Sequence, residues 1–293
     1  MTAPRGRDAV FVVGMGRSGS SAFARILALC GGALPRELLP PNFANPRGYW
    51  EPLRALELND AFLGAHQSSW YDGSLALQSG RVGAAERVAF VDAIVRFFET
   101  EYGAARTAVV KEPRITALLP YWIEGARRAG RGAKFVHVWR DPAPVAASLA
   151  DRDGVGADHA FALWLKYNLI AERDTRGSPR VLAAFDELLG DWETVAAKCI
   201  GQLGLHASVD DRAREAVAGF LVPDLRHHRG AASCGALRIA RLEEWVARTL
   251  AALRAAGGPD AARLDAILEE YAGSRVPLEF RLKSPIAARV PAG

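Results

Sequence analysis

Residues 9–21 read Ala-Val-Phe-Val-Val-Gly-Met-Gly-Arg-Ser-Gly-Ser-Ser, and this stretch decides the fold. Ala9–Val13 is a short, apolar run rich in β-branched residues, which predicts a buried strand. Three glycines follow at once, and glycine lets backbone amides close around a bound group. Apolar residues then recur at i, i+3, i+4 and i+7, which indicates a helix: Phe23, Ile26, Leu27 and Cys30. A strand, a glycine turn and a helix N-terminus together predict an anion site, because unpaired N–H groups and the helix dipole point at one spot.

The spacing of this turn is almost that of an ATP-binding P-loop, since four residues lie between Gly14 and Gly19. Ser20, however, occupies the position of the P-loop lysine, and Arg17 is the only cation in the turn. The loop therefore suits a phosphate-like group but lacks the residue that reaches the outer phosphates of ATP. A glycine turn without a ligand is the alternative interpretation.

Composition indicates one globular domain over residues 1–293, because half of the 293 residues are hydrophobic and a quarter are charged. A net charge of +4 suits a small anionic ligand better than a nucleic acid. We expect no membrane span, because the first apolar run ends in glycines. Three widely spaced cysteines give no metal-ligand spacing and fit a reduced, cytoplasmic chain.

Four strand candidates alternate with helical stretches: Ala9–Val13, Thr107–Val110, Lys134–Trp139 and Arg180–Phe185. This alternation predicts a parallel sheet covered by helices on both faces, a P-loop-like three-layer α/β/α architecture. Leu34–Pro52 is rich in Pro and Asn and is expected to form a long loop. Residues 231–293 are expected to be a helical extension of the same domain.

The second strand runs into Lys111-Glu112-Pro113-Arg114. The carboxyl ends of parallel strands face the ligand crevice, so these charges should stand on the same edge as the glycine loop. The third strand ends in Arg140 and Asp141, with Ser148 eight residues after the arginine, about two turns into a helix. The guanidinium offers a rigid fork of donors for a phosphate. The rival interpretation takes Val136–Asp141 as a Walker-B-like strand that ends in a magnesium-binding aspartate, but it requires a P-loop Lys-[Ser/Thr], which is missing.

Glu51 ends the stretch Asn45-Pro-Arg-Gly-Tyr-Trp-Glu in the long loop. A carboxylate beside two aromatic residues should be partly desolvated, which would suit a general base. Anchoring of the loop by the aromatic side chains, with Glu51 exposed, is the alternative. Glu112 is the second candidate base, but adjacent Lys111 and Arg114 should keep it ionised and occupied. His66 is the next candidate.

These stretches together resemble sulfotransferases that use 3′-phosphoadenosine 5′-phosphosulfate (PAPS), and in particular a bacterial group with a Gly-x-x-Arg-Ser-Gly-[Thr/Ser]-Ser loop. The chain has Glu112 where that group has Asp, which leaves the role of Glu112 open. The resemblance implies that Lys111 and the loop bind the 5′-phosphosulfate, the loop residues being Gly16, Arg17, Ser18, Gly19, Ser20 and Ser21. It also implies that Arg140 and Ser148 bind the 3′-phosphate, that Tyr167 contacts the adenine and that Arg229 lies in a late basic loop.

The resemblance implies sulfuryl transfer from PAPS to a hydroxyl or amine of a small-molecule or carbohydrate acceptor, with 3′-phosphoadenosine 5′-phosphate (PAP) as product and no metal. The expected catalytic residues are Arg17, Lys111 and the two carboxylates Glu51 and Glu112. A P-loop kinase and a non-catalytic nucleotide-binding module are the alternative functions. Ser20, in place of the P-loop lysine, argues against the kinase. Arg17 and Lys111 beside one loop argue for catalysis and not for nucleotide binding alone.

Overall fold

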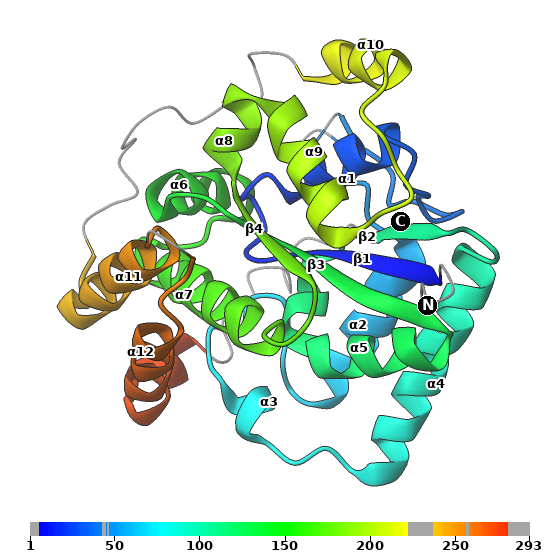
Figure 1. Ribbon diagram of the computed structural model, residues 1–293. Helices are drawn as coiled ribbons and strands as arrows, with labels where there is room; N and C mark the ends of the chain where they lie inside the picture. Colours follow the sequence, from blue (N-terminus) through cyan, green and yellow to red (C-terminus); the bar gives the residue numbers. More distant parts are fainter. Residues whose placement is uncertain (1–5, 43–44, 46, 222–236, 256–257, 281–293) are drawn as a thin grey trace.

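The computed structural model describes residues 6–42, 45, 47–221, 237–255 and 258–280. Its centre is a sheet in the order β2-β1-β3-β4 (Figure 1), and every strand pair is parallel. The strands are β1 (Arg7–Val13), β2 (Thr107–Val110), β3 (Arg131–Trp139) and β4 (Arg180–Ala184). All four carboxyl ends therefore lie at one edge of the sheet, as the sequence predicts.

Helices cover both faces of the sheet. The principal α-helices are α1 (Ser20–Leu29), α2 (Leu53–Ala65), α3 (Ala76–Ser79), α4 (Ala84–Glu101), α5 (Leu119–Arg128), α6 (Pro142–Asp153), α7 (Ala157–Asp174), α8 (Phe185–Gly190), α9 (Trp192–Leu203), α10 (Asp211–Phe220), α11 (Ala240–Leu253) and α12 (Ala261–Gly273). The described part of the chain also contains the 3₁₀ helices η1 (Pro113–Leu118) and η3 (Val276–Phe280). In Figure 1, α1, α8 and α9 lie on one side of the sheet, and α2, α5 and α7 on the other.

The alternation of side chains along β1 divides the core. Val10 and Val12 pack with α1 and α9 in one cluster of buried residues, whereas Phe11 and Val13 pack with α4 and α5 in another. A third cluster joins α7 to α6, α11 and α12. The expected α/β/α layering is thus confirmed.

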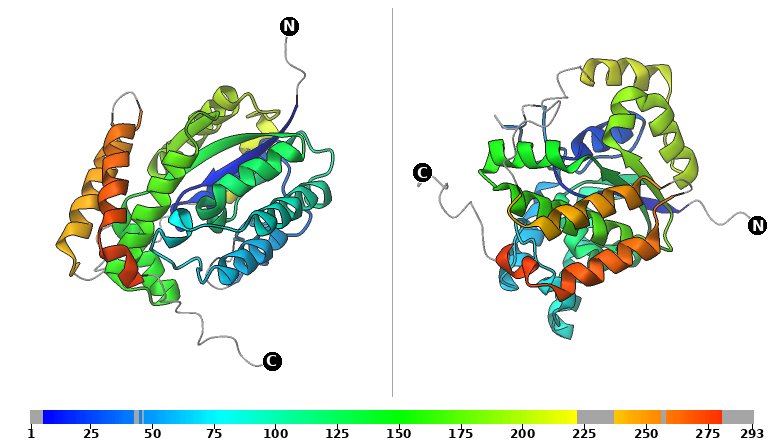
Figure 2. Two further views of the ribbon diagram at one scale, coloured as in Figure 1. Left: turned by 90° about the horizontal axis from the view of Figure 1, so that it is seen from below. Right: turned by 90° about the vertical axis from the view of Figure 1, so that its left-hand side faces the viewer.

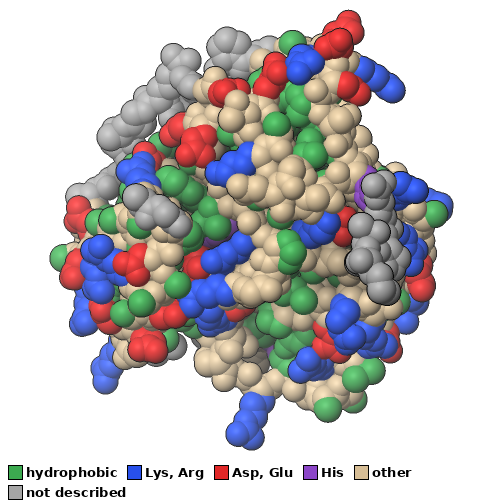
Figure 3. Space-filling view, viewed as in Figure 1, with side chains coloured by type: hydrophobic (Ala, Val, Ile, Leu, Met, Phe, Trp, Pro, Cys, Tyr) green, Lys and Arg blue, Asp and Glu red, His purple; other side chains and the backbone are tan. Residues whose placement is uncertain are grey.

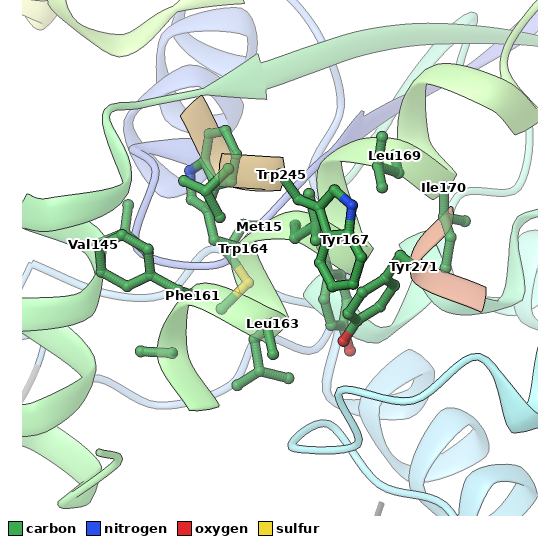
Figure 4. Close-up of a cluster of buried hydrophobic side chains, with 14 of the residues drawn as sticks. Met15, Val145, Phe161, Leu163, Trp164, Tyr167, Leu169, Ile170, Trp245 and Tyr271 are labelled. Carbon is green, nitrogen blue, oxygen red and sulfur yellow. The ribbon is translucent and has the colours of Figure 1, made fainter. Parts of the chain in front are cut away.

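The C-terminal helices α11 and α12 pack against α7, outside the layer that covers the sheet (Figure 2). Tyr271 of α12 and Trp245 of α11 are both fully buried beside it. Figure 4 shows these two side chains in one cluster with Trp164 and Tyr167 of α7. On the face seen in Figure 3, positive and negative side chains are interspersed, in keeping with the mild net charge.

The element boundaries correct the sequence analysis in a few places. Phe185, expected to end the fourth strand, instead begins α8. The sequence analysis does not predict helices α2 and α5, although the buried residues Leu119, Trp122 and Ala126 of α5 recur at i, i+3 and i+7. Within 34–52 the described residues form no helix or strand of their own, in agreement with the expected loop.

Candidate active site

The glycine loop joins the end of β1 to the start of α1. Gly14 has a φ of 118°, and a Cβ there would overlap the carbonyl oxygen of Val138. Gly19 has a φ of 87° and lies against the ring of Phe185, so a side chain has neither the conformation nor the room. Thr116 of η1 fixes the start of the loop, because its Oγ1 accepts a hydrogen bond from Gly14 N over 3.1 Å. The loop is therefore shaped by contacts from β3, α8 and η1.

Ser18 lies at the centre of this loop and is fully buried. Its Oγ has no hydrogen-bond partner within the part of the chain that the structure describes. Helix α1 begins two residues later, and its N-cap, Gly19, supplies no side-chain hydrogen bond. A buried hydroxyl without a partner costs free energy, and a bound anion at the helix N-terminus would satisfy it.

Arg17 joins the loop to α6. Its Nε donates a hydrogen bond to Ser148 Oγ over 2.8 Å. Its backbone has a φ of 67°, which is uncommon for a residue with a side chain. Burial, followed by the positive charge of Arg152, lowers the pKa of the Arg17 guanidinium. Arg17 is thus a partly buried cation next to the loop and to another arginine, an environment that favours a bound anion.

Lys111 stands directly after β2 and connects three segments of the chain. Its Nζ donates hydrogen bonds to Ser21 Oγ over 3.1 Å and to Tyr49 O over 3.3 Å. It also forms an ion pair with Glu51, and both side chains are less than one tenth exposed. The long loop is therefore held against the glycine loop by a buried charge pair.

Glu112 is also buried, but its partners differ from those that the sequence suggested. Arg114 NH1 donates to its Oε1 over 2.5 Å, and Arg114 N and Asn59 Nδ2 donate to its Oε2 over 3.1 and 2.6 Å. Lys111, expected to help hold Glu112, pairs with Glu51 instead. Burial raises the pKa of Glu112 above its ordinary value, against the opposing effect of Arg114. The side chains of Lys111 and Glu112 diverge because successive residues of an extended chain point to opposite sides.

Arg140 lies at the carboxyl end of β3, as expected. Its guanidinium lies over the Phe185 ring, 4.9 Å from the centroid, and its backbone carbonyl accepts from Trp164 Nε1 over 2.8 Å. Burial lowers the pKa of the guanidinium. Ser148 is buried on α6 and accepts from Arg17. The two residues expected to bind a 3′-phosphate thus lie near the same loop.

Two expected site residues, Tyr167 and His66, have other contacts in the structure, and a third lies outside the described residues. Tyr167, expected to contact an adenine, is 1% exposed and lies in the core, where its Oη donates to Trp70 O over 3.2 Å. Its ring is covered because the indole of Trp70 packs 5.2 Å away. His66 directly follows α2 and contacts Phe62 O and Glu86, neither of which belongs to the cluster above. Arg229 lies outside the described residues.

Sequence reasoning missed several residues that shape the site. Thr116, Phe185 and Trp70 all touch the glycine loop, and Asn59 holds Glu112. No local pattern distinguishes them from core residues, because their significance comes only from contacts between distant segments.

Among the described residues, no group of three His, Cys, Asp or Glu side chains is placed to hold a metal ion. Across the same residues, none of the helices combines the length and apolar character needed to cross a membrane.

Comparison with known proteins gives similarity at the level of structure. No protein-family model matches the chain, and no curated protein matches it. The sulfotransferase STF1 from Mycobacterium tuberculosis is similar at 18% identity and a TM-score of 0.47, over 81% of this chain and 76% of that one. The sulfotransferase domain of the Synechococcus olefin synthase shares 15% identity over 92% and 95% of the two chains, with a TM-score of 0.45. A sulfotransferase from Alicyclobacillus acidocaldarius shares 18% identity over 85% and 99%, with a TM-score of 0.42. These three solved structures, to which the chain is similar, are all sulfotransferases.

Proposed function

We propose that the protein is a PAPS-dependent sulfotransferase that transfers a sulfuryl group to a hydroxyl or amine of a small-molecule or carbohydrate acceptor. One observation carries the proposal: cations and hydroxyls from three separate segments meet at one glycine loop that lacks the P-loop lysine. Arg17 contacts Ser148 of α6, and Lys111 after β2 contacts Ser21 of α1. These are the residues on which the sequence resembles that group of enzymes.

The loop would hold the 5′-phosphosulfate of PAPS. Ser18 Oγ, which has no partner among the described residues, and the N-terminus of α1 offer donors to an anion. Arg17 in the loop and Lys111 beside Ser21 offer positive charge. Arg140 and Ser148 would hold the 3′-phosphate. When bound, PAPS supplies the activated sulfuryl group. The contribution of this chain is to orient the donor and to stabilise the charge that develops on the leaving phosphate oxygen.

Glu51 is our candidate for the general base. Its carboxylate is buried and pairs with Lys111, which places a proton acceptor beside the cation that faces the loop. An anion bound in the loop would compete for Lys111 and leave Glu51 free to accept the acceptor's proton. Glu112 is bonded to Asn59 and Arg114 through both oxygens, which suits a positioning role.

The free, buried thiols of Cys30 and Cys199 support a reducing compartment, and we infer the cytoplasm.

A panel of nucleotides tests the proposal. Thermal unfolding is measured with PAP, PAPS, ATP and GTP, each with and without magnesium, because a ligand stabilises the state that it binds. We expect stabilisation by PAP and PAPS without magnesium, and transfer of ³⁵S-labelled sulfate from PAPS to an acceptor in a panel of phenols, sugars and amines. Stabilisation by ATP or GTP alone, dependent on magnesium, would instead support a kinase. Binding of PAP without transfer to any acceptor would support a nucleotide-binding module.

A further inference from the structure

A short irregular segment, Trp70–Gly73, is held in the interior by an unusual set of hydrogen bonds. Its four consecutive backbone carbonyls each accept from a different buried side chain. The donors are Tyr167 Oη to Trp70 O at 3.2 Å, His159 Nε2 to Tyr71 O at 2.6 Å, Lys166 Nζ to Asp72 O at 2.6 Å and Tyr271 Oη to Gly73 O at 2.7 Å. Three donors come from α7 and the fourth from α12. We call Trp70–Gly73 the cradled segment.

Burial of this segment costs free energy unless its backbone carbonyls are hydrogen-bonded, so the four donor side chains do more than fill space. An irregular backbone in the interior has polar groups that no helix or sheet satisfies. Lys166 is 1% exposed, and burial lowers its pKa to about 8. The carboxylate of Asp72 is itself fixed by hydrogen bonds from Ser68 Oγ at 2.7 Å and Ser74 Oγ at 2.6 Å. In Figure 4 the hydroxyl ends of Tyr167 and Tyr271 point to the same side of the cluster.

The first residue of the cradled segment, Trp70, contacts the glycine loop. The indole of Trp70 lies so close to Gly16 that a Cβ at residue 16 would overlap the ring edge. The φ of Gly16 is not positive, so its backbone conformation does not require a glycine. The indole of Trp70 requires one instead, because it leaves no room for a side chain. Met15, the neighbouring residue of the loop, is fully buried in the same cluster as Trp70. The backbone just before Arg17 and Ser18 is therefore packed against Trp70.

We propose that the cradled segment positions the anion loop: Lys166, Tyr167, His159 and Tyr271 fix its backbone so that Trp70 buttresses Gly16. Helix α12, in the C-terminal part of the chain, is thereby coupled to the affinity of the loop for its ligand. The identity of that ligand rests on the proposed function, but the contact between Trp70 and Gly16 does not. All five side chains are positioning residues, since they act through the loop.

A double-mutant cycle tests the contact itself. Trp70→Leu, Gly16→Ala and the double variant are compared for PAP affinity by calorimetry and for unfolding in urea. We expect Gly16→Ala to weaken PAP binding by about tenfold or more in the wild-type background, because its methyl group displaces the loop or the indole. In the Trp70→Leu background the same change should cost much less. Equal costs in both backgrounds would overturn the buttress.

A matched pair of tyrosine variants tests the long-range coupling. Tyr271→Phe removes one donor to the cradled segment. Tyr102→Phe removes an equivalent buried bond, from Tyr102 Oη to Val109 O at 2.8 Å, in a different cluster. We expect both to lower Tm by similar amounts, but only Tyr271→Phe to weaken PAP binding, by about twofold to thirtyfold, the range for coupling through packed side chains. Unchanged PAP affinity in Tyr271→Phe would refute the coupling.

The two proposals fail in different ways. If no nucleotide of the panel binds the wild-type protein, the proposed function fails. The unfolding measurements of the Trp70–Gly16 cycle still give a coupling free energy in that case, because they need no ligand. Additive unfolding effects together with normal PAP binding would instead reject the buttress and leave the sulfotransferase assignment standing.

Discussion

Arg17 Nε lies 2.8 Å from Ser148 Oγ, although 131 residues separate the two in sequence. The first residue belongs to the glycine loop and the second to α6, so this bond connects the two expected halves of a nucleotide site. Ser148 and Arg152 are four residues apart on α6 and share its face, which explains why Arg152 is the charge that most lowers the pKa of Arg17. The fold therefore brings Arg17 and Arg152 together before any ligand binds, with Arg152 also paired to Asp153.

We expect Arg17→Ala to lower kcat with PAPS by about a hundredfold, since losing one preorganised transition-state contact typically costs ~3 kcal/mol. The fold should survive, because the side chain is only half-buried and its bond to Ser148 is one of many. Steady-state kinetics and a thermal melt check the two statements. Arg17→Lys, which keeps the charge but not the planar fork, should recover only part of the rate. Wild-type kcat in Arg17→Ala would mean that the loop serves another purpose.

Arg140→Ala and Ser148→Ala should weaken PAP binding far more than binding of adenosine 5′-phosphosulfate, which lacks the 3′-phosphate. A hydrogen bond to a charged group contributes roughly 1.5–3 kcal/mol, so the arginine should matter more than the serine. Calorimetry with both nucleotides measures this, and the nucleotide without the 3′-phosphate is the internal control. Equal losses for the two ligands would show that neither residue distinguishes the 3′-phosphate.

Glu51→Gln keeps the shape of the side chain and removes its basicity. We expect kcat to fall by roughly 10²–10⁴ with nearly unchanged PAP affinity, which is the signature of a lost general base. Glu112→Gln is the comparison, because Glu112 is also buried but is hydrogen-bonded to Arg114 and Asn59, whereas Lys111 pairs with Glu51. An active Glu51→Gln beside an inactive Glu112→Gln that binds PAP normally would reverse the assignment. If both variants are active, the proton acceptor is another group.

Stability should fall as the pH is lowered from about 6.5 to about 4, because of His137. This side chain is fully buried beneath the loop, and burial lowers its pKa from 6.5 to about 4. Between these values the unfolded chain binds a proton that the folded chain does not, so the free energy of unfolding decreases as the pH is lowered. The shift corresponds to about 2 kcal/mol lost between pH 7.5 and 5.

Urea unfolding at these two pH values measures the effect, with His137→Gln as the comparison. Asn168, Glu172 and Arg180 are the groups that face His137, and only the last two carry charge. The variant should be less stable at neutral pH and should lose less stability on acidification than the wild type. An identical pH dependence in both proteins would assign the acid sensitivity to other groups.

Local patterns in the sequence were sufficient for the sheet and the loop. A run of β-branched residues such as Thr107–Val110 forms a strand wherever it is buried, and glycines spaced like Gly14 and Gly19 form a turn that few other sequences permit. Charges directly after such strands must stand at the carboxyl edge of a parallel sheet, which is why Lys111 and Arg140 could be placed. Helix α5 could not be placed in this way, because it has 10 residues and follows η1 directly. That is shorter than the window of about 11–18 residues in which a helical period is recognised.

What the sequence by itself determined was thus the architecture and the identity of the cations at the loop. Only the tertiary structure decided their partners: Lys111 pairs with Glu51 and not with adjacent Glu112, Tyr167 faces the core, and Trp70 fills the space beside Gly16. The physical reason is that strand and turn preferences act over a few neighbouring residues. Pairing and packing depend instead on which distant segments the folded chain brings within a few ångströms, and on how much water remains between them.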